Sequence, residues 1–136
     1  MDADAAEDWV SSWAASVSER AAQTQELSRR VADLTASAAG ANGAVRVTVA
    51  ASGVVTEMRL DERVRNWPAA RISAEIMATM RRAQARLAGA VADVAAQTVG
   101  VDSETGRAVV ASYASRFPEP PEESDDDPSP RRRGLW

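Results

Sequence analysis

The 136-residue sequence contains no cysteine and no histidine. Without cysteine the chain has no disulfide framework, no thiolate nucleophile and no cysteine-ligated zinc. Without histidine it lacks the commonest general base and the commonest transition-metal ligand. These absences argue against hydrolytic triads and zinc sites. We therefore expect a protein that is not an enzyme and that holds no cofactor or metal.

Long apolar runs and lysine are also absent. No apolar run is long enough to span a membrane, and the N-terminus MDADAAEDW is acidic, whereas a signal peptide begins with basic residues. The sequence therefore predicts a cytoplasmic protein with no membrane partner. All sixteen basic residues are arginine. The many alanines and valines favour codon bias in a GC-rich genome as the reason, and selection for bidentate phosphate contacts is the alternative.

One stretch, residues 43–61 (GAVRVTVAASGVVTEMRLD), has a hydrophobic period of two residues. Such alternation, bounded by glycine and serine, predicts a β-hairpin with one buried face. The candidates for the core or for a subunit interface are Val45, Val47, Val49, Met58 and Leu60. With residues 50–53 as the loop, Val49 pairs with Val54 and Val45 with Met58. This register also places Arg46 opposite Glu57, an opposite-charge pair across the strands.

Two long amphipathic helices flank the hairpin. The first is predicted over residues 3–36, where a heptad seam is sustained for nearly four repeats. The seam consists of Val10, Trp13, Val17, Thr24, Leu27, Val31 and Leu34, with Arg20 at one repeat position. A helix of this length needs a partner, either the second helix or the same helix of another subunit. Trp9 lies one turn before Trp13, where it caps a coiled coil or offers a ligand platform.

The second helix is predicted over residues 69–99, ended by Gly100. Its apolar stripe comprises Ile72, Ile76, Met80, Ala83, Leu87, Ala90 and Val94. Residues 35–43 are small and glycine-rich, and a short extra strand over 34–38 would pair at the hairpin edge. The fold class is therefore α+β, with a long helix, a small antiparallel sheet of two or three strands, and a second long helix.

The C-terminal part divides into two segments after the 1–100 domain. Residues 101–117 form a short helix if Ser103 caps it. Residues 118–136 are acidic and proline-rich and are predicted to be disordered. The chain ends in Arg-Arg-Arg-Gly-Leu-Trp, which is either a docking motif or an unselected end.

The arginines are unevenly distributed. The net charge is −4, but residues 118–136 contribute −3, and residues 59–86 hold seven arginines against three acids. Arginines at this density bind phosphates without reading bases. The DNA-binding candidates are Arg63, Arg65, Arg71, Arg81, Arg82 and Arg86. The alternative is a solvated surface on which Arg71 and Arg82 pair with Glu75. Trp67, before Pro68, either covers the hairpin edge or the helix base, or stacks on a base.

The order helix, glycine-rich turn, hairpin, helix resembles the YbaB/EbfC family of nucleoid-associated proteins over about residues 5–99. The residues that carry this resemblance are Gly43, Val45, Val47, Gly53, Leu60 and Asp61. It implies an α-β-α protomer whose sheet joins that of a second subunit in a tweezer-shaped homodimer with helical arms. It also implies binding of double-stranded DNA with little sequence preference, a nucleoid location and no catalysis.

The sequence departs from the family pattern in three respects. Glu62 follows Asp61 where proline is usual, lysine is absent, and the segment from Val101 onward resembles an addition. Actinobacterial relatives include accessory proteins of type VII secretion loci that act through protein contacts. A protein-binding adaptor, using the helical arms or the tail, is therefore the alternative function. A third hypothesis is that the acidic tail competes with DNA for the arginines.

Overall fold

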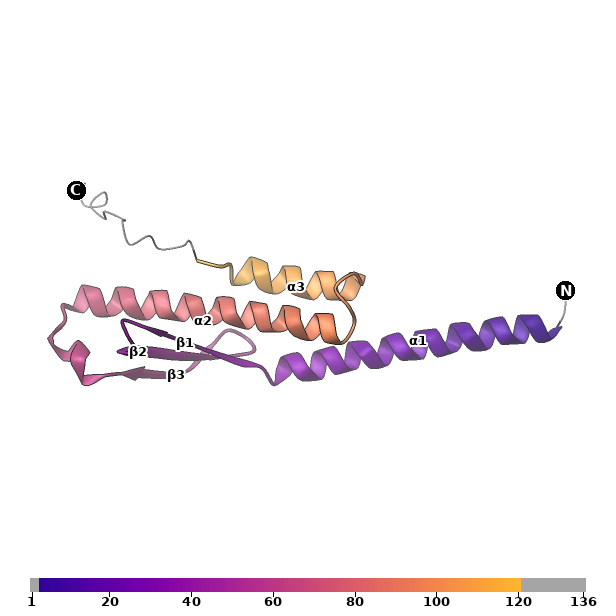
Figure 1. The fold of residues 1–136 in the computed structure, drawn as a ribbon, viewed down its shortest axis with the longest axis horizontal. Helices are drawn as coiled ribbons and strands as arrows, with labels where there is room; N and C mark the ends of the chain where they lie inside the picture. Colours follow the sequence, from indigo (N-terminus) through magenta and orange to yellow (C-terminus); the bar gives the residue numbers. More distant parts are fainter. Residues whose placement is uncertain (1–2, 121–136) are drawn as a thin grey trace, which may run out of the picture.

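The computed structural model describes residues 3–120, which form two long helices, a three-stranded sheet and a shorter helix (Figure 1). The acidic segment 121–136 lies outside the described residues. The order agrees with the predicted α+β class, and the third strand is the one expected beside the hairpin. The elements are α1 (Ala3–Ala32), β1 (Thr35–Gly40), β2 (Val45–Ala50), β3 (Val55–Leu60), the 3-10 helix η1 (Glu62–Asn66), α2 (Ala69–Gln97) and α3 (Glu104–Arg116).

Helix α1 projects away from the rest of the molecule toward the N-terminus (Figure 1). It ends at Ala32 rather than at residue 36, because residues 35–40 pair antiparallel with β2 as strand β1. Leu27 is its only buried residue. Leu27 packs with Val94 and Ala95 of α2 in a small apolar cluster. The predicted heptad seam therefore meets α2 only near its C-terminal end, and the arm beyond is exposed.

The sheet has the order β1-β2-β3, and the predicted hairpin register is wrong by two residues. Val45 lies opposite Leu60 rather than Met58. Arg46 lies opposite Arg59 rather than Glu57, so the predicted opposite-charge pair is replaced by two facing arginines. The strands still present the same residues of β2 to the core, because a shift of two residues preserves the alternation of faces.

Two local features produce this shift. The loop holds three residues rather than four, since the Ala50 N–H donates to the Val54 carbonyl at 2.9 Å. Gly53, at φ +89°, takes the left-handed position that such a loop requires. The pairing then shifts once more, because Val49 faces Val55 while Thr48 faces Glu57. Thr56 is left without an opposite residue, which is the arrangement of a β-bulge.

The main core lies between the sheet and α2. Its fully buried members include Val45, Val47 and Val49 of β2 and Leu87 of α2. Helix α2 packs mainly against β1 and β2. The buried residues of α2 are Thr79, Ala83, Leu87, Val91, Val94 and Ala95, whereas the predicted stripe residues Ile72, Ile76 and Met80 are partly buried.

Met58 and Leu60, the remaining core or interface candidates, are 44% and 45% exposed. They lie opposite Val47 and Val45, and therefore on the inner face of the sheet. Because α2 packs mainly against β1 and β2, the described chain leaves these two side chains nearly half exposed. The inner face of β3 is thus an apolar strip without a complete partner.

Helix α3 is N-capped by Ser103, whose Oγ accepts the Gly106 N–H at 2.9 Å. In Figure 1, α2 lies between the sheet and α3, and it contacts both. The Tyr113 hydroxyl donates to the Ala51 carbonyl at 2.8 Å, and the Phe117 ring lies against Gly53. These contacts hold α3 to the β2–β3 turn.

Candidate nucleic-acid interface

Arg63 is held in place by the chain on both sides of η1. Asp61 caps η1 by accepting the Arg63 N–H at 2.8 Å, and its carboxylate lies 3.2 Å from the Arg63 Nε. These hydrogen bonds lower the pKa of Asp61, the backbone N–H being the larger cause. The Arg63 Nη2 also donates to the Asn42 carbonyl at 3.2 Å. Arg63 therefore joins the connection to the β1–β2 turn.

Arg65 forms an exposed ion pair with Glu62, with an N–O distance of 3.3 Å. Its side chain is three-quarters exposed. Because exposed pairs of this kind contribute little to stability, a phosphate oxygen exchanges readily with the glutamate. Arg65 is therefore available to an anion.

Arg71, in the first turn of α2, stacks on the Trp67 ring with its guanidinium carbon 3.7 Å from the ring centroid. Trp67 is partly buried and packs against the main core. This agrees with a role for Trp67 in covering the base of the helix. One face of the indole is occupied by Arg71, so stacking of a base on that face would require Arg71 to move.

Arg82 and Arg86 are hydrogen-bonded to the outer edge of β1. The Arg82 Nη2 donates to the Ala39 carbonyl at 3.2 Å, and the Arg86 Nη1 donates to the Ser37 carbonyl at 2.9 Å. An edge strand exposes unpaired backbone groups, and these two guanidinium groups satisfy two of them. Both arginines therefore have a structural role and keep their remaining N–H donors for other ligands.

Gly40 explains how α2 comes so close to β1. A Cβ atom at Gly40 would lie 2.5 Å from the Thr79 Oγ1 and 2.6 Å from the Arg82 Nη2. The Thr79 Oγ1, fully buried, accepts a second hydrogen bond from Arg82 at 3.2 Å. The alternative in which Glu75 pairs with Arg71 and Arg82 is therefore wrong, because Arg82 binds Thr79 and β1 while Arg71 stacks on Trp67.

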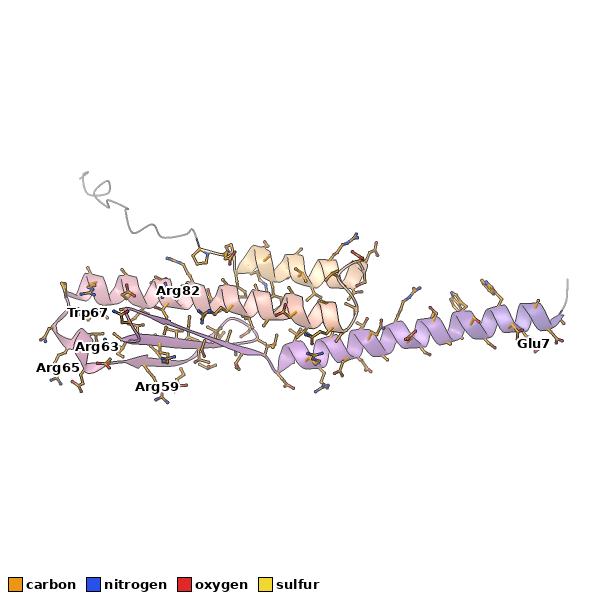
Figure 2. All side chains as sticks on the ribbon, in the orientation of Figure 1. Glu7, Arg59, Arg63, Arg65, Trp67 and Arg82 are labelled. Atoms are coloured by element: carbon orange, nitrogen blue, oxygen red, sulfur yellow. The ribbon has the colours of Figure 1, made fainter. Side chains whose placement is uncertain are left out.

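The six predicted arginines do not share one surface. Arg63 and Arg65 lie near Trp67 at the η1 end, whereas Arg82 lies on α2 (Figure 2). Arg81 is exposed and forms no hydrogen bond or ion pair within residues 3–120. The structure thus brings together Arg63, Arg65 and Arg71 at one end and separates Arg81, Arg82 and Arg86 from them.

Sequence reasoning did not include Arg46 and Arg59 among the candidates. They face each other across β2 and β3, on the sheet face opposite α2. Arg59 pairs with Glu57 on its own strand at 2.7 Å, and Arg46 has no partner among the described residues. Figure 2 shows Arg59 on the sheet side, near Arg63 and Arg65. Only the correct strand register places Arg46 opposite Arg59. The predicted four-residue loop placed Arg46 opposite Glu57 instead.

The acidic residues and the helices of the described chain bear on metal and membrane binding. Residues 3–120 contain no group of three acidic residues placed to hold a metal ion. None of the helices in this part is long and apolar enough to cross a membrane.

Comparison with known proteins gives one family match. Residues 10–101 match the model of a family described as the YbaB/EbfC DNA-binding family. The match includes most of α1, the sheet, η1 and α2, and it ends before α3. Comparisons with curated proteins and with solved structures gave no match.

Proposed function

This chain belongs to the YbaB/EbfC DNA-binding family, and from that premise we propose that it binds double-stranded DNA as a homodimer with little sequence preference. In this proposal it is a non-enzymatic protein of the nucleoid. The observation that carries the proposal is the facing pair Arg46 and Arg59 on the open side of the sheet.

Two arginines opposite each other repel, so their position costs stability in the free protein. Glu57 offsets part of that cost for Arg59 only. A phosphate bound between the two guanidinium groups removes the repulsion, and guanidinium groups bind phosphate oxygens in a bidentate manner. The pair is therefore better suited to the DNA-bound state than to the free state.

The other arginines extend this surface. Arg63, Arg65 and Arg71 lie at the η1 end. The carboxylate partners of Arg63 and Arg65 are exposed and exchangeable, and Arg71 stacks on Trp67. We assign them further phosphate contacts. Arg81, Arg82 and Arg86 lie elsewhere on α2. We assign them contacts with the phosphates of a longer duplex, which Arg82 and Arg86 would make through the N–H groups that are not bonded to β1. Contacts of this kind position a protein on DNA without reading its bases, which accounts for the low sequence preference.

The homodimer is supported by the strip formed by Met58 and Leu60. Half-exposed apolar side chains at the edge of a sheet favour association with a second sheet. A second subunit placed there would shield both residues and would double the number of arginines available to one duplex.

Gel shifts at low salt test the proposal directly. We expect complexes of similar affinity with three unrelated duplexes of equal length. Arg46→Gln should weaken all three to the same extent, whereas the matched change Arg107→Gln, at an exposed arginine of α3, should leave them unchanged. Absence of any complex, or equal effects of the two changes, would contradict the proposal.

A further inference from the structure

The free end of α1 carries a row of exposed apolar side chains. Trp9 is 67% exposed and Trp13 is 59% exposed, and Val10 and Val17 lie in the same region of the helix. A lone helix does not keep two tryptophans in water without a partner surface. The structure supplies a candidate surface at the other end of the same helix.

That surface is an apolar groove of about 390 Å³ between α1, the β2–β3 turn and α3. Leu27 and Val31 of α1 form one wall, Val109 and Tyr113 of α3 form another, and Ala51 closes the end. A groove of this size and composition accommodates large apolar side chains. It depends on α3, which lies beyond the residues that match the family.

The exposed row and the groove belong to a single helix face. Val10, Trp13 and Val17 are related to Thr24, Leu27 and Val31 by multiples of seven residues. With a rotation of about 100° per residue, all six positions lie within one third of the helix circumference. The N-terminal half of the face is uncovered, and the C-terminal half lines the groove. Each copy of the chain thus presents an apolar ridge and a groove to receive one.

We propose that the α1 arms of two copies pair antiparallel, so that Val10 and Trp13 of each copy enter the groove of the other. In this register Val10 lies level with Leu27 of the second copy, whose largely buried side chain lines the groove, and Trp13 lies level with its Thr24. The contact is reciprocal, as a two-fold interface requires. It uses a surface distinct from the β3 strip, and therefore it stands whether or not the sheets associate.

Charge selects a second copy in the antiparallel orientation. The free end carries Asp4, Glu7 and Asp8 and no basic residue within its first three turns. The groove end presents Arg30, which donates to Gln97, and Arg116, whose guanidinium lies 4.5 Å from the Tyr113 ring centroid. Antiparallel arms bring the acidic end beside these arginines, whereas parallel arms would place acid beside acid. Antiparallel helix dipoles also attract.

Disulfide trapping in the full chain tests the orientation. The protein has no cysteine, so only introduced thiols can react. Positions 16 and 23 flank the seam, and in the proposed register Ser16 of one copy faces Gln23 of the other. Within one chain they lie two turns apart, about 10 Å along the helix, which is too far for a disulfide.

We expect the double variant Ser16→Cys/Gln23→Cys to form an interchain disulfide and each single variant to form none. A disulfide in Ser16→Cys alone would indicate parallel arms and overturn the proposal. Failure of the double variant to cross-link would also overturn it.

A mass measurement separates this contact from the sheet contact. Leu60→Glu places a charge on the β3 strip and blocks sheet association, and the protein should still form a dimer through its arms. Adding Val10→Ser and Trp13→Ser should then give monomers. If Leu60→Glu alone gives monomers, arm pairing is overturned while the sheet-mediated homodimer stands.

Discussion

Arg46 and Arg59 lie directly opposite each other on β2 and β3, and both side chains are exposed on the face of the sheet that α2 leaves open. Like charges in this position are unfavourable for folding. The pair therefore gives substitutions whose effects on stability and on DNA binding have opposite signs.

Arg46→Glu should stabilise the free protein while weakening DNA binding. The glutamate would face Arg59, and an opposite-charge pair across strands is worth roughly 0.2–1 kcal/mol. Urea denaturation of the two proteins measures the difference. A loss of stability, or unchanged affinity for DNA, would show that the pair is not an anion site held at the expense of stability.

Gly53 and Gly89 form a matched pair for substitution by alanine. Gly53 has φ +89° and lies against the Phe117 ring, so Gly53→Ala should cost at least about 1–2 kcal/mol from backbone strain, with further cost from displacing α3. Gly89 lies in α2 with no atom near its missing side chain. Gly89→Ala should stabilise by about 0.5–1 kcal/mol. Thermal unfolding of both variants measures the two effects, and equal shifts would contradict this assignment.

The β3 strip is tested in a chain whose arms cannot pair. In a background of Val10→Ser and Trp13→Ser, the protein should remain a dimer through its sheets. Leu60→Glu should convert it to a monomer that keeps its circular dichroism spectrum. Val54→Glu is the control, because Val54 is 62% exposed but lies before β3, next to the turn. Light scattering gives the masses, and a dimer that survives Leu60→Glu would exclude the strip as the interface.

The lowered pKa of Asp61 gives a pH dependence of known sign. A carboxylate whose pKa is lower in the folded than in the unfolded chain stabilises the fold above its ordinary pKa of 3.8. This contribution is lost as the pH falls through the lowered value. Asp61→Asn should therefore be less stable than wild type near neutrality, and the gap should close in acid. NMR titration of the Asp61 carboxyl should give a midpoint below 3.8, and a midpoint at or above it would contradict the contacts with Arg63.

Local features of the fold could be predicted from the sequence because neighbouring residues determine them. Ser103 caps α3 through an atom three residues away, and Gly53 provides the turn through its own φ. The β2–β3 register could not be predicted, because residues far away in the sequence bind the three-residue loop. The Gln84 side chain donates to the Gly53 carbonyl at 3.0 Å, and the Tyr113 hydroxyl donates to Ala51.

The error in register extended to the candidate site. With Arg46 placed opposite Glu57, the pair of arginines on the sheet was concealed. On α2, Arg82 and Arg86 are four residues apart and therefore lie on one side of the helix. The sequence gave no indication that Gly40 lets the helix approach β1, where both arginines bind backbone carbonyls. Helical spacing locates charged residues on a surface, and only tertiary packing shows which of them are engaged.

The most direct test of the central claim is the salt dependence of duplex binding by the wild-type protein and by Arg46→Gln/Arg59→Gln. The logarithm of the binding constant should fall linearly with the logarithm of salt concentration, by about 0.9 for each phosphate neutralised. The double variant should show a shallower slope, by roughly 0.9 for each subunit whose arginine pair binds one phosphate. An identical slope in the two proteins, or no binding by the wild type at low salt, would contradict the assignment of the sheet face as the DNA-binding surface.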